Sequence, residues 1–349
     1  MKDIPNLRTA DDIPADQKVK FYQKGTFTVG NRLVDADERN VQASMNRSNA
    51  ITSGHRACQG CGEALGARYA LDTAMRATGG NMIASNATGC LEVFTTPYPE
   101  TSWQMPWMHS LFGNAPAVAS GMQAAMKAKG RDTRIIAQGG DGGTVDIGFG
   151  CLSGMFERND DVLYICYDNE AYMNTGVQRS GATPGGARTA TTMPAGDAYP
   201  GNVFGTGKNL PRIAMAHNIP YVATASVAYL QDLEAKVERA MSFRGARYIH
   251  VYVPCPLGWG CASNATINLA RLVVETGMFP LYEAEHGHIV QTRPIRQRVP
   301  VEDYLKPQRR FAHLFKTESG KAAIEKLQAM CDYNIAEYDL LRAEEETLA

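Results

Sequence analysis

Hydrophobic positions follow two different spacings from about residue 55 onward. In several segments apolar side chains recur every three to four residues, as in a helix with one buried face. Short apolar runs separate these segments and are typical of strands buried on both faces. The pattern predicts helices at residues 62–78, 114–130, 145–159, 209–217, 229–243 and 264–276, and strands at residues 81–85, 133–138, 161–169, 221–226 and 248–255.

Strands that alternate with helices of this length predict an α/β fold: a mostly parallel sheet with helices on both faces. The alternation defines a central domain at residues 51–288. Residues 1–50 lack strong periodicity and are interpreted as an N-terminal arm. Residues 289–349 are expected to form a C-terminal extension that packs on the domain or on a partner subunit. Residues 175–207 form a Gly/Thr/Pro-rich segment that is too long for an ordinary connection, which indicates a functional loop.

Composition excludes some classes of function. The formal net charge is −1, so no basic field attracts nucleic acid. No apolar run approaches the roughly 20 residues of a membrane span. The polar, acidic start does not resemble a secretory signal, and we therefore expect a cytoplasmic protein whose cysteines are not paired in disulfides.

The strongest chemical signal is the stretch AQGGDGGTVDIG at residues 137–148. A predicted strand runs into glycines, an aspartate and more glycines before a helix begins. Glycines let the backbone approach a ligand closely, and a helix N-terminus favours an anion such as a diphosphate. A plain turn would also explain an isolated Gly-Asp-Gly, but ligands in open α/β sheets bind beyond the carboxyl ends of strands.

The next predicted strand ends in YDNEAYMN at residues 167–174. Asp141 and Asn169 can therefore stand side by side at one edge of the sheet. A carboxylate, an amide oxygen, a backbone carbonyl and two phosphate oxygens would suit Mg²⁺. The alternative is that Asn169 only caps a loop.

Four of the eight cysteines lie beside Gly or Pro at the ends of predicted elements: Cys58, Cys61, Cys90 and Cys255. Two residues between cysteines let both sulfurs converge on one centre, and a 4Fe–4S cluster or a four-cysteine zinc site would use four such ligands. Spacing does not distinguish these two sites. A thioredoxin-like pair needs no distant third and fourth cysteine. Of the other cysteines, Cys261 is a rival fourth ligand. Cys151 and Cys166 lie in apolar segments, as expected of buried thiols. The sequence around Cys331 indicates no chemical role.

These motifs together resemble a known family. Gly140-Asp141-Gly142, followed after 26 residues by Asn169, resembles the thiamin diphosphate motif. More closely, the chain from about 55 to 315 is similar to the β subunit, or C-terminal domain, of pyruvate:ferredoxin oxidoreductases. The blocks that carry this resemblance are ACQGCGE, NATGC, the segment from GDGGTVDIG to DNEAYMNTG, VYVPCP and YLKPQRRFAHL.

The resemblance implies particular roles. Mg²⁺ would be bound by Asp141, Asn169 and the carbonyl of Ala171, and Asn174 would face the reacting substrate as a catalytic residue. The 4Fe–4S ligands would be Cys58, Cys61, Cys90 and Cys255, with Cys255 preferred over Cys261 because it directly follows a strand, as in the family. The residues expected to surround thiamin diphosphate are Glu63, Cys90, Gly140, Asp141, Gly142, Gly143, Asn169, Glu170, Ala171, Tyr172, Met173 and Asn174.

The implied activity is the oxidative decarboxylation of a 2-oxo acid, with pyruvate favoured. Coenzyme A would accept the acyl group, and the cluster would pass electrons to ferredoxin or another acceptor. The chain has no room for a pyrimidine-binding domain. The resemblance therefore implies an α subunit that supplies this domain and its catalytic glutamate, and further γ and ferredoxin-like δ subunits. The chain alone should be inactive.

Other interpretations remain open from the residues. Related enzymes accept other 2-oxo acids, including phenylglyoxylate. A non-catalytic iron–sulfur electron-transfer module would have the cluster without thiamin diphosphate, and an acetolactate synthase-type enzyme would need no cluster. His109 could line the cofactor site, whereas His217 is expected to be structural, residues 284–290 to lie at the surface and residues 183–188 to form a turn.

Overall fold

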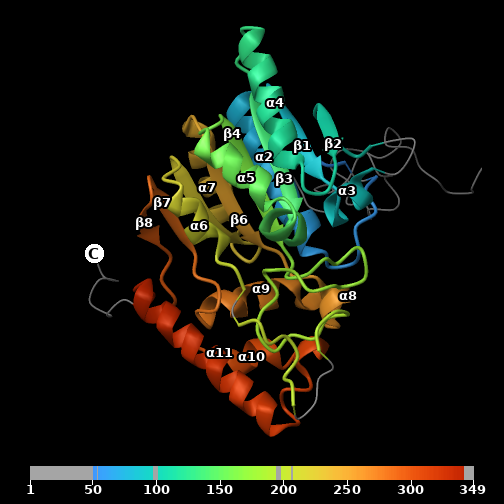
Figure 1. Cartoon of the computed structure of the whole chain (residues 1–349), viewed down its shortest axis with the longest axis vertical. Coiled ribbons are helices and arrows are strands. Elements are labelled where there is room, and N and C mark those ends of the chain that lie inside the picture. The colour runs from blue at the N-terminus through green and yellow to red at the C-terminus, as the bar shows by residue number, and fades with distance from the viewer. Residues whose placement is uncertain (1–49, 53, 97–100, 194–197, 206, 342–349) are drawn as a thin grey trace, which may run out of the picture.

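An eight-stranded sheet lies at the centre of the computed structural model, which describes residues 50–52, 54–96, 101–193, 198–205 and 207–341 (Figure 1). The strand order is β2-β1-β3-β4-β6-β5-β7-β8, and the first six strands are parallel. β7 and β8 pair antiparallel at one edge. The mostly parallel α/β sheet predicted from the sequence is confirmed. The strands are β1 Met82–Ala87, β2 Trp107–Ser110, β3 Arg134–Gly140, β4 Val162–Asp168, β5 Tyr221–Ser226, β6 Arg247–Tyr252, β7 Tyr282–Glu285 and β8 His288–Thr292.

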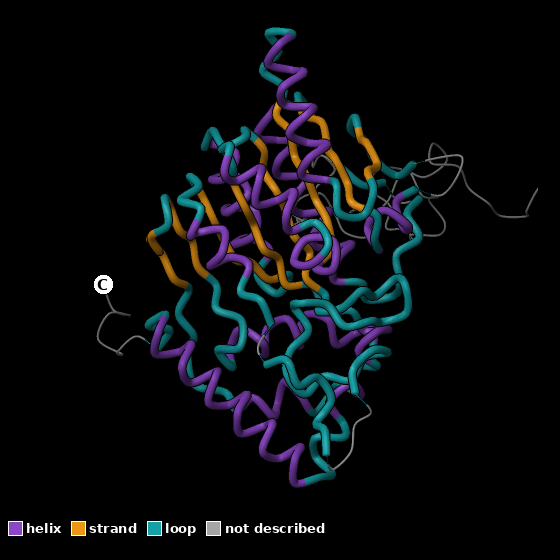
Figure 2. Tube along the Cα trace, viewed as in Figure 1, coloured by secondary structure: helices purple, strands orange, loops and turns teal. Residues whose placement is uncertain are grey.

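Helices cover both faces of the sheet, as the alternating pattern predicts (Figure 2). α4, α5 and α6 bury apolar side chains against one face, and the same hydrophobic cluster continues into α9, α10 and α11. α2, α3 and α7 pack on the other face. The helices are α2 Gly62–Thr78, α3 Cys90–Thr95, α4 Ala115–Ala128, α5 Phe149–Glu157, α6 Leu210–Ala216, α7 Leu230–Ser242, α8 Pro256–Trp259, α9 Thr266–Glu275, α10 Val301–Leu305 and α11 Glu318–Glu337.

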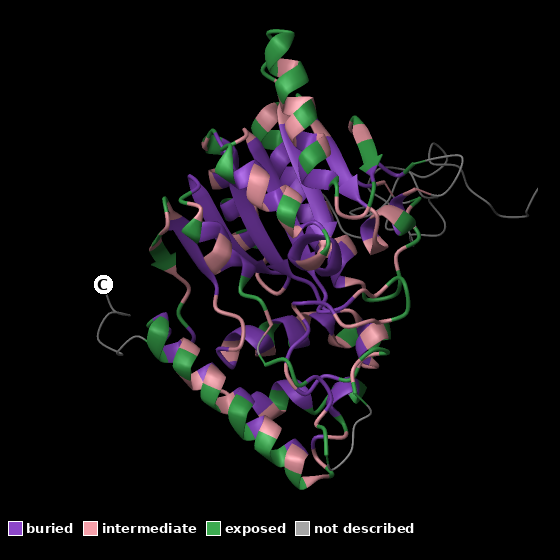
Figure 3. Ribbon diagram, in the orientation of Figure 1, coloured by how far each residue is buried: buried purple, intermediate pink, exposed green. Residues whose placement is uncertain are grey.

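The central strands are buried along their whole length, which explains their continuous apolar runs. Every residue of β4, β5 and β6 is buried (Figure 3). The edge strands β2 and β8 are mostly exposed, so their sequences lack this signal. The sequence analysis therefore missed β2 and β8. It also missed the short, mostly buried strand β7 and the short helices α3, α8 and α10.

The C-terminal extension lies beside the carboxyl ends of the parallel strands, where α10 and α11 occupy the lower part of Figure 1. Its apolar side chains, among them Val301, Phe311 and Leu327, belong to the same core as β4 and β6. Strand β8 carries the sheet to Thr292, four residues past the expected end of the central domain. The N-terminal arm, apart from Ala50, lies outside the described residues, as do residues 342–349.

Candidate cofactor site

Two chain segments leave the same edge of the sheet next to one another. β3 and β4 are neighbours, and Gly140 pairs with Tyr167 near their carboxyl ends. After β3 the chain forms a π-helical turn, Gly142–Asp146, and α5 begins at Phe149. The single helix expected at residues 145–159 is therefore two elements. The turn and the loop after β4 enclose a small cavity.

The glycines of this turn are required by close packing. A Cβ atom on Gly142 would lie 2.6 Å from ring carbons of Tyr172, and one on Gly143 would lie 3.1 Å from the carbonyl oxygen of Phe112. Both glycines line the cavity. Their bare backbone can therefore contact a ligand that larger residues would exclude.

Asp141 and Asn169 meet at the edge of the sheet, as the sequence analysis expected. Their exposed fractions are 1 % and 5 %. The Oδ1 atoms of both side chains are buried without a hydrogen-bond partner. Buried oxygens are almost always paired, because leaving one without a partner costs free energy. Two orphaned oxygens beside a backbone-lined cavity fit a bound cation, and Asp141, Asn169 and Ala171 can hold Mg²⁺ there.

Neighbouring groups hold both side chains in place. Ser180 Oγ donates a hydrogen bond to Asp141 Oδ2 at 2.5 Å. Asn169 Nδ2 donates to Glu63 Oε2 at 3.3 Å, so its amide oxygen stays free for a ligand. Burial and the nearby charge of Asp168 raise the pKa of Asp141 well above its usual range. Burial likewise raises the pKa of Glu63 to about 7, although hydrogen bonds from Leu91 and Asn169 oppose the shift.

The cavity brings together almost all of the residues expected around the cofactor. It is lined by Glu63, Thr88, Gly89, Cys90, Phe112, Gly140, Asp141, Gly142, Gly143, Asn169, Ala171, Tyr172, Met173, Asn174 and Thr175. Glu170 does not line it. The sequence analysis did not name Thr88, Gly89, Phe112 and Thr175. It also missed Ser180, which lies in the 175–207 loop that it marked as functional.

The side chain of Glu170 points instead into a buried network. It forms an ion pair with Arg310, which lies after α10 and is also buried. The Arg310 guanidinium stacks 3.8 Å from the ring centroid of Trp259. The Trp259 indole N–H donates to the carbonyl of Asn169 at 3.0 Å. Through these contacts the C-terminal extension supports the loop that carries the candidate Mg²⁺ ligand.

Three of the four candidate cluster cysteines lie at helix N-termini. Cys61 is the N-cap of α2, Cys90 is the first residue of α3, and Cys255 is the N-cap of α8. The backbone N–H groups of Ala64 and Gly258 donate to the sulfurs of Cys61 and Cys255, both at 3.4 Å. Such positions favour a thiolate, the form that binds metals, but burial outweighs them and raises the pKa of Cys61 to about 12 and that of Cys255 to about 11.

The four thiols also influence one another electrostatically. Burial is the largest of the effects that raise the pKa of Cys90. The charges of Glu63 and of the other three candidate cysteines raise this pKa further. Within the described part of the chain, no three His, Cys, Asp or Glu side chains converge closely enough to hold a single metal ion.

The remaining candidates lie elsewhere. Cys261 packs against the same hydrophobic cluster as Cys255, but unlike Cys255 it is not among the groups that shift the Cys90 pKa. His109 is exposed on β2 and bonds Thr88 Oγ1 at 2.7 Å rather than lining the cavity. His217 bonds Ser153 at 2.9 Å and has the structural role expected. Residues 284–290 form most of the surface hairpin of β7 and β8.

Comparison with known proteins agrees with this geometry. Residues 87–251 match the family model described as thiamine pyrophosphate enzyme, C-terminal TPP binding domain. The chain is 51 % identical over 292 residues to pyruvate synthase subunit PorB of Methanosarcina barkeri, covering 83 % of this chain and 97 % of that protein. The chain belongs to the β subunits of the 2-oxoacid:ferredoxin oxidoreductase family. It is a subunit of an oxidoreductase that acts on a 2-oxo acid.

Other relatives of this β subunit extend the comparison. It is 44 % identical to PorB of Thermotoga maritima, over 81 % of this chain and 89 % of that protein. It is 43 % identical to ketoisovalerate oxidoreductase subunit VorB of Pyrococcus abyssi, over 76 % of this chain and 86 % of that protein. A solved 2-oxoglutarate:ferredoxin oxidoreductase from Magnetococcus marinus has the same fold, with a TM-score of 0.50 and 23 % identity over 62 % of this chain and 77 % of that one.

None of the helices in the described ranges is both long and apolar enough to cross a membrane.

Proposed function

We propose that this β subunit binds thiamin diphosphate, Mg²⁺ and a 4Fe–4S cluster in a cytoplasmic enzyme that oxidises pyruvate and transfers its acetyl group to coenzyme A. The observation that carries the proposal is the pair of orphaned buried oxygens on Asp141 and Asn169, beside the glycine turn. These oxygens supply a cation site next to the glycine backbone that would contact a diphosphate. Thiamin diphosphate, when bound, would supply the electron sink that decarboxylation of a 2-oxo acid requires.

The chain's own residues would position and enclose this coenzyme. The backbone of Gly142 and Gly143 would contact the diphosphate, while Asp141, Asn169 and the carbonyl of Ala171 would hold the cation that neutralises it. Asn174 is exposed at the open end of the cavity, where substrate would enter, so we assign its amide to substrate orientation.

The four cysteines would hold the cluster beside the coenzyme. Cys90 supports this assignment, because it lines the cofactor cavity and also interacts with the other three thiols. A cubane places its own iron and sulfide atoms between the ligands, so it needs a wider arrangement of thiols than a single zinc ion does. Zinc also has no redox chemistry and could not accept electrons.

An α subunit would complete the active site. The described residues contain one α/β unit, and we infer that a partner supplies the pyrimidine-binding domain and its glutamate. Further γ and ferredoxin-like δ subunits would carry electrons to ferredoxin or another acceptor. The purified single chain should therefore be inactive, and turnover by that chain would contradict this assembly.

The test is to measure bound iron, sulfide and thiamin diphosphate in one preparation of the intact complex, and then its activity on a panel of 2-oxo acids. We expect about four irons per β subunit from this chain in addition to those of other subunits. Asp141→Asn should abolish coenzyme binding, whereas Asp132→Asn, at an exposed position, should not. Cluster iron without thiamin diphosphate would instead indicate an electron-transfer module.

Branched-chain 2-oxo acids are the second candidate substrates. The similarity to a ketoisovalerate oxidoreductase subunit supports them, because its identity to this chain is close to that of the Thermotoga pyruvate synthase subunit. A higher kcat/KM for a branched-chain acid than for pyruvate would favour this alternative.

A further inference from the structure

The loop that carries two candidate Mg²⁺ ligands contains a residue in an unfavourable backbone conformation. Glu170 lies between Asn169 and Ala171 and has a φ of 66°, in the left-handed region that residues with a side chain rarely adopt. Asn169 and Ala171 both line the cofactor cavity, whereas the Glu170 side chain points away from it. A residue in such a conformation persists only when its surroundings hold it there. The placement of both ligands therefore depends on the groups that hold Glu170.

Asp168 supplies the hydrogen bond that closes this turn. It is the last residue of β4, and its side chain is buried. Its Oδ1 atom accepts a hydrogen bond from the backbone N–H of Glu170 at 2.8 Å. An aspartate that bonds the N–H two residues further along stabilises a turn of this kind. Because the bond depends on the orientation of the carboxylate, any group that fixes the Asp168 side chain also fixes the loop.

His250 fixes that carboxylate from the neighbouring strand. β4 and β6 pair in parallel with Cys166 opposite His250, so the alternation of side chains along β4 places Asp168 on the same face of the sheet as His250. His250 Nε2 lies 2.9 Å from Asp168 Oδ2. Its Nδ1 atom lies 2.6 Å from the hydroxyl of Tyr248, which is two residues earlier on the same face of β6. All of these side chains are buried.

These bonds form a chain with one consistent direction. An ionised carboxylate only accepts hydrogen bonds, so His250 Nε2 carries a proton and donates it to Asp168. Burial raises the pKa of Tyr248 well above its usual range, so its hydroxyl keeps its proton and can donate to Nδ1 of the neutral imidazole. The chain from Tyr248 through His250 to Asp168 therefore ends at the backbone of the metal-binding loop.

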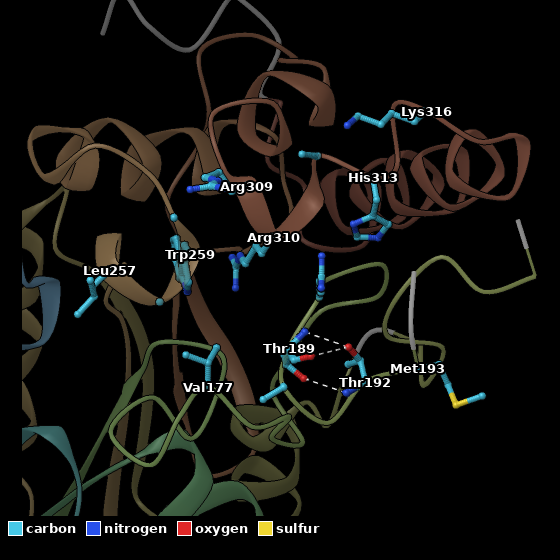
Figure 4. Close-up of a pocket in the computed structure, with 15 residues that line it drawn as sticks. Val177, Thr189, Thr192, Met193, Leu257, Trp259, Arg309, Arg310, His313 and Lys316 are labelled. Atoms are coloured by element: carbon cyan, nitrogen blue, oxygen red, sulfur yellow. Dashed lines mark hydrogen bonds between the residues drawn. The ribbon is translucent and has the colours of Figure 1, made fainter. Parts of the chain in front are cut away.

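The other side of this loop is held independently. The Trp259 indole N–H donates to the carbonyl of Asn169, and Figure 4 shows Trp259 beside Arg310. These contacts come from α8 and the C-terminal extension and do not include His250. The effect of His250 on the loop can therefore be measured separately from that of the extension.

We propose that His250 is a positioning residue for the metal site. Through Asp168 it holds the turn at Glu170. That turn directs two ligands, Asn169 and the Ala171 carbonyl, to one cation. The inference rests on the proposed function, in which the cation is the Mg²⁺ that neutralises the diphosphate. His250 does not line the cofactor cavity, so it acts on the coenzyme only through the loop.

The experiment removes Mg²⁺ and coenzyme from the intact complex and measures the binding of thiamin diphosphate by equilibrium dialysis at increasing Mg²⁺ concentration. In His250→Gln the amide nitrogen takes about the place of Nε2 and keeps the bond to Asp168. In His250→Asn it takes about the place of Nδ1, and that bond is lost. His250→Asn should raise the Mg²⁺ concentration for half-saturation about tenfold, as is typical when a group that orients a metal site is removed. His250→Gln should stay close to the wild type.

Two controls separate positioning from a general role in folding. His217→Asn changes a half-buried histidine that bonds Ser153 rather than the loop, and it should leave the Mg²⁺ requirement unchanged. At saturating Mg²⁺ and coenzyme, the kcat of His250→Asn should be close to that of the wild type. A purely structural role would instead lower the yield of complex and leave the Mg²⁺ dependence of the surviving complex unchanged.

Equal Mg²⁺ requirements in His250→Asn and His250→Gln would overturn the proposal. His250 and Asp168 border a cavity of about 350 Å³ between the sheet and α11, so there is room for the altered side chains. If His250→Asn does not assemble, Tyr248→Phe is measured in the same way. It should raise the Mg²⁺ requirement about threefold, because one hydrogen bond of the chain is lost, and no change would overturn the proposal.

The wild-type complex distinguishes this inference from the proposed function. If that complex binds no thiamin diphosphate at any Mg²⁺ concentration, the proposed function itself is refuted. If it binds the coenzyme and the two His250 variants behave alike, only the role of His250 is refuted.

Discussion

Removing the Arg310 side chain tests whether the C-terminal extension supports the cofactor loop. Arg310 and Glu170 form an ion pair whose side chains are 5 % and 7 % exposed. Substitution Arg310→Met keeps a long apolar side chain but leaves the Glu170 carboxylate buried without its cation. Breaking a buried pair in this way typically costs about 3–5 kcal/mol. We expect Arg310→Met to lower the free energy of unfolding by about this amount.

The matched control lies in the same segment. Lys306 pairs with Glu302 at 2.8 Å, but these side chains are 56 % and 46 % exposed. Water screens such a pair, and Lys306→Met should cost less than about 1 kcal/mol. The double variant Glu170→Gln/Arg310→Met should recover part of the stability lost in Arg310→Met, because it leaves no bare buried charge.

The assay is denaturant unfolding of the β subunit, followed by tryptophan fluorescence, together with coenzyme retention in the intact complex. Arg310→Met should also weaken coenzyme binding, since Trp259 bonds the carbonyl of Asn169 and stacks on Arg310. The reasoning is refuted if Arg310→Met is no more destabilising than Lys306→Met. It is also refuted if the double variant is less stable than the single one.

Three other predictions concern the cofactors. Gly142→Ala should weaken coenzyme binding at least tenfold, measured by equilibrium dialysis, because the added Cβ atom would lie 2.6 Å from the Tyr172 ring. An unchanged affinity would show that Tyr172 moves freely. A chelator such as EDTA should release thiamin diphosphate from the complex, and excess Mg²⁺ should restore binding; retention after full Mg²⁺ removal would contradict the role of Asp141. Cys255→Ser should lower cluster iron in an iron and sulfide assay whereas Cys261→Ser should not, and the opposite result would make Cys261 the ligand.

The alternation of apolar runs and helical periods was sufficient to predict the parallel core. Strands β4, β5 and β6 are buried on both faces, so their apolar residues form unbroken runs that the sequence displays directly. Edge strands do not need apolar residues at every position, because part of each edge strand faces solvent. β2 and β8 lie at the two ends of the sheet and are mostly exposed, and the sequence analysis did not separate them from loops.

By itself the sequence determined the glycine turn, Asp141, Asn169 and the cysteine positions, because these depend on local residue types at the ends of strands. Only the tertiary structure decided which distant residues complete the site. Ser180 reaches Asp141 from a long loop, and Arg310 reaches Glu170 from 140 residues further along the chain. Such contacts depend on how the loops and the extension fold back over the edge of the sheet, and packing, rather than any local pattern, selects them.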